Sequence, residues 1–204
     1  MNCLLCDKPL DNVPTWQQFL GILKDASACP SCLKRFERID SMAQDEWLDS
    51  VHSLYAYNEA ARDYLHQFKF MQDIALADIF AQPLRHVLNH PKKVIVPIPM
   101  HAANKKKRTF SQVDAFLRAA NIPYQTLLEK TTESVMGEKT RSERLAMTEL
   151  FTATADIPSN EAVYVLVDDI YTTGTTLRHA AQALKQRGVC RVEAVTLFRP
   201  IREK

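Results

Sequence analysis

Short runs of apolar residues alternate with helical patterns along this chain. The runs are Val51–Tyr57, Val94–Pro99, Val163–Val167 and Cys190–Phe198. The two central runs are almost wholly apolar and rich in β-branched residues, which is typical of strands buried on both faces of a parallel sheet. We therefore predict an α/β protein built on a parallel sheet.

The segment after the first run has the periodicity of a helix, and Asn58 is placed to cap its N-terminus. The apolar stripe of this helix consists of Ala61, Tyr64, Leu65 and Phe68. Lys69, within the sequence FKF, falls in the last turn, where a lysine usually complements the helix dipole.

Two further segments have helical patterns. The first, from Asp73 to Leu88, contains Pro83, which should kink or break the helix. The second is an amphipathic helix that follows Arg108. The segment Ile39–Asp49 is polar and mixed, and we interpret it as a connection between an N-terminal module and the main domain.

One stretch, VYVLVDDIYTTGTTL from Val163 to Leu177, organises the rest of the chain. Asp168 and Asp169 come at the carboxyl end of the strand, where open α/β sheets bind ligands. Their side chains point in opposite directions, so at most one can face the layers that cover the sheet, and both need solvent or donors. A diol or a hydrated metal would supply such donors. The turn Thr172–Thr176 opens a helix that runs to about Gly188, and its free N–H groups favour a phosphate. A diol site beside a phosphate site describes a ribose 5-phosphate.

Other interpretations of this turn fit the residues less well. An ordinary strand-to-helix turn would use aspartate and threonine as caps, but capping needs one such residue and not a run. A Walker-type loop is excluded because the glycine–lysine pair is missing, and a dinucleotide fingerprint would need more glycines.

Composition and charge narrow the class of protein. A chain of 204 residues can bury a substantial core, and its length fits one domain with an appendage. The net charge of +2 is too slight to indicate a nucleic-acid-binding protein by itself. The N-terminus is not a basic-then-apolar leader, and there is no long apolar run. We therefore expect a cytoplasmic protein without a membrane span.

Four cysteines form two C-x-x-C pairs, Cys3 with Cys6 and Cys29 with Cys32. Two such pairs can close a tetrahedral zinc site with no open position, which is a structural site. Redox disulfides are the alternative in an oxidising compartment. We predict a zinc-binding module over residues 1–40, much of whose folding energy comes from the metal. Residues at helical spacing between the pairs are interpreted as a packing face: Trp16, Phe19, Leu20 and Leu23.

Two remaining features are a lone cysteine and a basic run. Cys190, before the last predicted strand, is interpreted as a buried thiol. Lys105 to Arg108 follow the strand Val94–Pro99, at the sheet edge that also carries Asp168. A short basic run is often only solvated. Here its position suggests a clamp for pyrophosphate, to which arginine is suited by its bidentate contacts.

The sequence VLVDDIYTTGTTL closely resembles the phosphoribosyl pyrophosphate signature of type I phosphoribosyltransferases. The resemblance implies that fold for residues 51–204, with magnesium bound together with phosphoribosyl pyrophosphate. It also implies that Asp168 and Asp169 hold the ribose hydroxyls and that the 5′-phosphate lies in the turn formed by Tyr171, Thr172, Thr173, Gly174, Thr175 and Thr176. Lys107, Arg108 and Arg141 would then stabilise the developing charge of the reaction.

Other segments resemble the ComF family. RTFSQ, from Arg108 to Gln112, stands where that family has RGFNQ, and FKF places Lys69 at a candidate site position. Glu129–Phe151 resembles a flexible loop that closes over the substrate; the alternative is a disordered connector. Residues that match the family pattern of this loop are Arg141, Glu143, Arg144 and Phe151; residues that depart from it are Met136, Lys139 and Met147.

Three classes of function remain open. The first is a phosphoribosyltransferase with an unknown acceptor. The second is a non-catalytic competence protein that binds single-stranded DNA through the zinc module and Lys105–Arg108, or that binds DNA-uptake proteins. The third is a partner-binding scaffold, for which the sequence offers no exposed helix or strand pattern.

Overall fold

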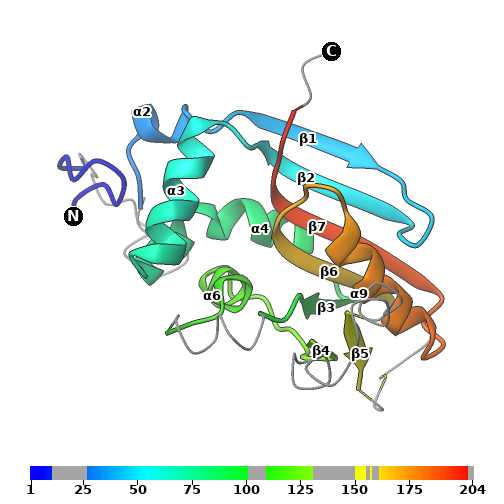
Figure 1. The fold of residues 1–204 in the computed structure, drawn as a ribbon. Helices are drawn as coiled ribbons and strands as arrows, with labels where there is room; N and C mark the ends of the chain where they lie inside the picture. Colours follow the sequence, from blue (N-terminus) through cyan, green and yellow to red (C-terminus); the bar gives the residue numbers. More distant parts are fainter. Residues whose placement is uncertain (11–26, 101–108, 131–149, 155–156, 158–160, 202–204) are drawn as a thin grey trace, which may run out of the picture.

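The computed structural model describes residues 1–10, 27–100, 109–130, 150–154, 157 and 161–201. Its centre is a five-stranded sheet in the order β1-β2-β7-β6-β3, drawn in Figure 1. The strands of this sheet are β1 (Arg38–Ala43), β2 (Ser50–Ala56), β3 (Lys93–Pro97), β6 (Val163–Ile170) and β7 (Arg191–Arg199). A separate antiparallel pair consists of β4 (Leu128–Lys130) and β5 (Phe151–Ala153).

Strands β2, β7, β6 and β3 are parallel to their neighbours, so their carboxyl ends meet at one edge of the sheet. The predicted parallel α/β architecture is therefore confirmed. Strand β1 pairs with β2 in the antiparallel direction and forms one edge. It overlaps the segment Ile39–Asp49 that we interpreted as a connection, and that interpretation was wrong. None of the six residues of β1 is buried, which explains why the apolar pattern did not reveal a strand.

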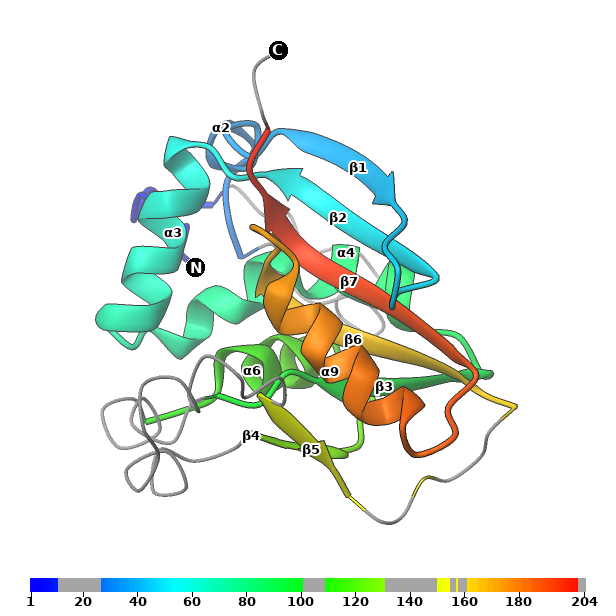
Figure 2. The same cartoon turned by 45° about the vertical axis from the view of Figure 1, so that its right-hand side comes forward.

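Two layers cover the sheet, and Figures 1 and 2 show them on opposite faces. One layer holds α3 (Glu59–Phe70), the 3-10 helix η1 (Ile74–Phe80), α4 (Ala81–Leu88) and α6 (Gln112–Ala119). The other holds α9 (Thr175–Lys185) and the β4–β5 pair. A one-turn helix, α2 (Pro30–Leu33), lies near the N-terminus.

Strand β6 is buried on both faces, as its apolar sequence predicts. Tyr164 and Leu166 pack into the core under α9, whereas Val165 and Val167 pack into the core under α3 and α6. All four are at most 1% exposed. The same alternation directs the side chains that follow, residues 168 and 169, toward opposite faces of the sheet.

Helix α3 forms as its sequence predicts. The Asn58 side chain accepts a hydrogen bond from the N–H of Ala61 at 3.1 Å, and the predicted apolar stripe is buried. The break predicted in the next segment is also present, since η1 changes to α4 at Ala81. Pro83 lies in the first turn of α4, where its missing N–H breaks no helical hydrogen bond.

The N-terminal cysteine segment packs on the same core as α3. Cys3, Ala28, Cys32 and Phe36 belong to the hydrophobic cluster that contains Tyr64. The Phe36 ring lies 5.9 Å from the Tyr64 ring and 5.1 Å from the Phe80 ring, in edge-to-face contacts. The division into residues 1–40 and 51–204 remains a prediction, and the proposed packing face at residues 16–23 lies outside the described part of the chain.

Cys190 corrects the sequence interpretation, because its side chain is exposed and not a buried thiol. It lies in the loop between α9 and β7, and the nearby buried residues are Val189 in this loop and Val192 in β7. Among the described residues, no helix has the length and apolar character that a membrane crossing requires.

Candidate functional site

A hollow lies at the carboxyl end of β6, where the chain turns into α9. It is open to solvent, and its volume of about 190 Å³ includes part of that solvent. Its lining contains most of the turn that the sequence assigned to a phosphate: Asp168, Ile170, Tyr171, Thr172, Gly174, Thr175, Thr176 and Leu177. Asp168 and three of the threonines, Thr172, Thr175 and Thr176, therefore line one space.

Gly174 sets the shape of this turn. It is the N-cap residue of α9 and has a φ of +77°, in the left-handed region that favours glycine. A Cβ atom at this position would come within 2.7 Å of Tyr171 Oη, so any side chain would collide with the Tyr171 ring. Gly174 has no side chain with which to cap α9, and among the first N–H groups of the helix that of Thr175 makes only a long hydrogen bond, 3.5 Å, to the Thr173 hydroxyl. These N–H groups can therefore serve an anion.

Tyr171 is fixed from two sides. Its backbone N–H donates to the Phe198 carbonyl at 2.8 Å, which joins the turn to the end of β7. The Arg199 guanidinium lies 4.8 Å from the centre of the Tyr171 ring, in a cation–π contact. The Thr173 and Thr175 hydroxyls are 3.0 Å apart on the exposed side of the turn. The turn is thus braced by its neighbours while its threonines stay accessible.

The two aspartates have different surroundings. Asp168 is partly buried, lines the hollow and accepts a hydrogen bond from the N–H of Asp169 at 2.9 Å. Asp169 is 8% exposed and forms an ion pair with Lys69 at the end of α3. Lys69 and Asp169 therefore meet on the face opposite to the phosphate turn, and Asp168 is the carboxylate that faces the hollow.

The electrostatics of Asp168 are unusual for a carboxylate. Burial and the negative charge of Asp169 raise the pKa of Asp168 to about 7. The hydrogen bond from the N–H of Asp169 lowers this pKa, as do the positive charges of Lys69 and Lys130. A positively charged or hydroxyl-bearing ligand would favour the ionised form of the side chain.

Several predicted site residues lie outside the described part of the chain. These are Lys107, Arg108 and Arg141, so the pyrophosphate clamp remains a prediction. The two departures from the RGFNQ pattern that can be placed have local structural roles. Thr109 Oγ1 donates to Gln72 Oε1 at 2.8 Å, and the Ser111 hydroxyl accepts from the N–H of Asp114 at the start of α6.

Sequence reasoning missed three basic residues near the hollow. Lys130 acts on Asp168 from β4, Arg199 stacks on Tyr171, and Arg178 of α9 donates to the Thr173 carbonyl. Only Arg178 could have been found from the sequence, because it lies within two helical turns of Gly174 on the predicted helix. The other two come from distant strands, and their approach depends on the order of strands in the sheet.

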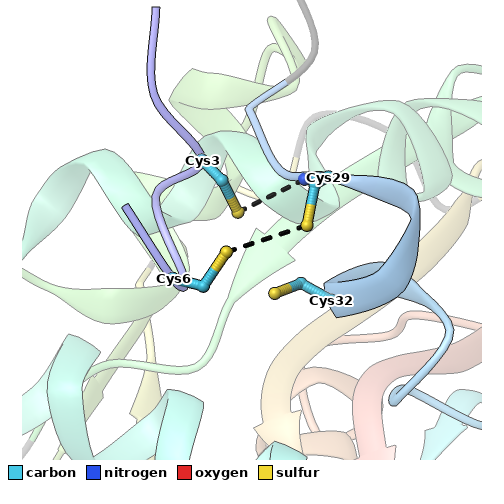
Figure 3. A group of neighbouring side chains, drawn as sticks. All are labelled: Cys3, Cys6, Cys29 and Cys32. Carbon is cyan, nitrogen blue, oxygen red and sulfur yellow. Dashed lines mark hydrogen bonds between the residues drawn. The ribbon is translucent and has the colours of Figure 1, made fainter. Parts of the chain in front are cut away.

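The four N-terminal cysteines form a compact cluster, shown in Figure 3. Their sulfur atoms all lie within 4.8 Å of one another, and the sulfurs of Cys6 and Cys29 are 3.8 Å apart. A tetrahedral zinc ion with Zn–S distances of about 2.3 Å needs sulfurs about 3.8 Å apart. The cluster can therefore hold a metal ion, and its geometry and thiol chemistry fit zinc.

Local hydrogen bonds prepare one of these thiols for a metal. Contact with the Ser31 hydroxyl, at 3.1 Å, lowers the pKa of Cys29 to about 6. The ionised thiolate is the form that binds a metal ion. The N–H of Cys29 donates to the Cys3 sulfur at 3.3 Å, an interaction that favours negative charge on that sulfur too. All five cysteines of the chain are free.

Comparisons with known proteins agree with the fold. Residues 72–204 match the phosphoribosyl transferase domain family, which places the chain in the phosphoribosyltransferase class. The chain is 31% identical over 221 residues to competence protein ComFC of Streptococcus pneumoniae, covering 98% of this chain and 100% of that protein. It is 26% identical over 230 residues to competence protein ComFC of Bacillus subtilis, covering 97% and 94%. The chain belongs, more narrowly, to the ComF family.

One solved structure gives a more distant likeness. The allosteric regulatory enzyme of purine biosynthesis is 19% identical, with a TM-score of 0.41. The alignment covers 59% of this chain and 25% of that one.

Proposed function

We propose that the protein binds 5-phosphoribosyl pyrophosphate, as its magnesium complex, in the hollow between β6 and α9. The observation that carries the proposal is the convergence of Asp168 with the N-terminal end of α9 around one open space. The domain match supports a phosphoribosyl ligand, and the ComFC relatives support a role in competence. Transfer of the phosphoribosyl group to a base or an amine is the reaction that such a site would carry out.

Each element of the site has one part in this proposal. The N–H groups of Gly174, Thr175 and Thr176 hold the 5′-phosphate, helped by the dipole of α9. The Asp168 carboxylate accepts hydrogen bonds from the ribose hydroxyls and faces the carbon at which positive charge develops. Asp169, which pairs with Lys69 on the other face of the sheet, acts on the site through its charge, because that charge raises the pKa of Asp168. Lys107, Arg108 and Arg141 are proposed to bind pyrophosphate.

Magnesium enters this account with the ligand. The hard oxygen atoms of the pyrophosphate and the ribose hydroxyls suit Mg²⁺, and the ion would add positive charge where the leaving group forms. Zinc, by contrast, is proposed as a resident structural ion in the cysteine cluster, where four sulfurs leave no open position.

Isothermal titration with phosphoribosyl pyrophosphate and magnesium tests the binding site. We expect Asp168→Asn to weaken the affinity about 10- to 100-fold, because charge-assisted hydrogen bonds contribute about 1.5–3 kcal/mol. Asp63→Asn is the matched control, since Asp63 is an exposed carboxylate on α3 and its removal should leave the affinity unchanged. Equal affinity in the wild type and Asp168→Asn would rule out the site. Release of pyrophosphate during a screen of bases and amines would then test turnover.

The affinity should also depend on pH through Asp168. Because the pKa of this group is about 7 and its ionised form binds the ribose, we expect binding to weaken about tenfold from about pH 8 to about pH 6. The phosphates of the ligand titrate in the same range, so Asp168→Asn supplies the correction. The pH dependence that remains after subtracting the variant's profile belongs to Asp168, and a flat difference would contradict the assignment.

A further inference from the structure

Arg178 joins the phosphate turn to a distant part of the chain. Its Nη2 atom donates to the Thr173 carbonyl at 2.5 Å, and its Nε atom lies 3.4 Å from Oδ2 of Asp45. Asp45 belongs to the loop between β1 and β2, and β7 separates these two strands from β6 in the sheet. The guanidinium therefore bridges the turn before α9 and the β1–β2 loop.

The Asp45 end of this bridge is rigid. The backbones of Asp45 and Leu48 exchange hydrogen bonds at 3.2 and 3.3 Å, and Leu48 is buried in the core under α9. Oδ1 of Asp45 accepts from the N–H of Trp47 at 3.4 Å, which orients the carboxylate. The Asp45 and Arg178 side chains are 15% and 42% exposed, so solvent screens this ion pair in part.

The Thr173 end of the bridge fixes a peptide plane. In a trans peptide the C=O and the following N–H point in opposite directions. Because Arg178 holds the Thr173 carbonyl, the N–H of Gly174 must point away from Arg178. Gly174 lines the hollow and Thr173 does not. The N–H that Arg178 orients is therefore the one at the proposed phosphate position.

We propose that Arg178 is a positioning residue, which aims the Gly174 N–H at the phosphate of the ligand with Asp45 as its anchor. This inference rests on the proposed function and deepens it, because it names the residue that orients one of the N–H donors to the 5′-phosphate. Without the bridge, the Thr173–Gly174 peptide can rotate, and the donor must be ordered again each time the ligand binds.

The glycine content of the chain makes this peptide directly observable. The sequence has only four glycines, so protein labelled with ¹⁵N-glycine gives four backbone amide signals. Ribose 5-phosphate and inorganic phosphate are the probes, because both carry the phosphate without the pyrophosphate. In the wild type we expect the Gly174 signal to move downfield with the probe. In Arg178→Ala the free-state signal of Gly174 should shift or broaden, the Gly188 signal should stay, and the affinity should fall about tenfold.

Further variants separate positioning from other roles. Arg178→Lys keeps one of the two contacts and should give an intermediate affinity, which matters if Arg178→Ala does not fold. Asp45→Asn should move the Gly174 signal in the same direction as Arg178→Ala does. The affinity of the variant that carries both substitutions should be no lower than that of Arg178→Ala alone. Arg191→Ala, which removes an exposed arginine paired with Glu193, is the control and should change neither signal nor affinity.

The outcomes distinguish this inference from the proposed function. If the wild type binds neither these probes nor phosphoribosyl pyrophosphate with magnesium, the proposed function fails, while the Gly174 signals of the free variants still test the bridge. If Arg178→Ala leaves the Gly174 signal and the affinity unchanged, the inference is overturned. A lower affinity with an unchanged free-state signal, and no effect of Asp45→Asn, would mean that Arg178 contacts phosphate itself, which also overturns it.

Discussion

Replacement of Cys32 by serine should release the metal and destabilise the whole protein. Cys32 is 7% exposed, and with Cys3 it packs in the cluster that contains Phe36 and Tyr64. Loss of a structural metal is among the few changes that lower the free energy of unfolding by more than about 4 kcal/mol. Metal analysis of the purified protein, followed by thermal unfolding with and without a chelator, measures both effects.

Cys190→Ser is the matched control, since Cys190 is an exposed cysteine outside the cluster. We expect this variant to keep one zinc ion per chain and the wild-type melting temperature. If Cys32→Ser matched the wild type in metal content and stability, the four sulfurs would not form a structural site.

Removal of Lys69 should have the second largest effect on stability. The side chains of Lys69 and Asp169 are 19% and 12% exposed, so Lys69→Met leaves a mostly buried carboxylate without its partner. Breaking a buried pair in this way costs about 3–5 kcal/mol, and we expect the lower end because Asp169 keeps some contact with solvent. Urea unfolding followed by circular dichroism gives the free energy of unfolding of each variant.

A second substitution shows whether the isolated charge causes this loss. Lys69→Met combined with Asp169→Asn removes both charges and should recover most of the stability, because the interaction energy in such a cycle belongs to the pair. Arg62→Met, on the same helix, breaks the exposed pair with Glu59 and should change stability by less than about 0.5 kcal/mol. An equal loss in Lys69→Met and Arg62→Met would contradict the role of the buried pair.

The central fold was predictable because its signals are local. Strand β6 is apolar on both faces, the turn after it contains the glycine that its geometry requires, and Asn58 caps α3 as its position predicts. The two C-x-x-C pairs likewise come together in space as their spacing indicates. In each case the residues that determine the structure lie within a few positions of one another, or, like the paired cysteines, form a motif with few structural interpretations.

The remaining features depend on contacts between distant segments. Strand β1 is held at the sheet edge by pairing with β2, and its polar side chains contain no sign of that partner. Nothing local joins Asp45 to Arg178 or Lys69 to Asp169, since each pair is about 100 or more positions apart and meets only after the sheet has formed. Cys190 was misjudged for a related reason, because its side chain is exposed although Val189 and Val192 beside it are buried.

The packing of Cys3, Cys32 and Phe36 against Tyr64 bears on how the molecule loses its structure. Segments that share one continuous apolar interior melt together, because exposing one removes the contacts of the other. Scanning calorimetry of the zinc-loaded protein should therefore record a single endotherm. The ion would then stabilise the entire chain, including the edge of the sheet where the sugar phosphate is proposed to bind.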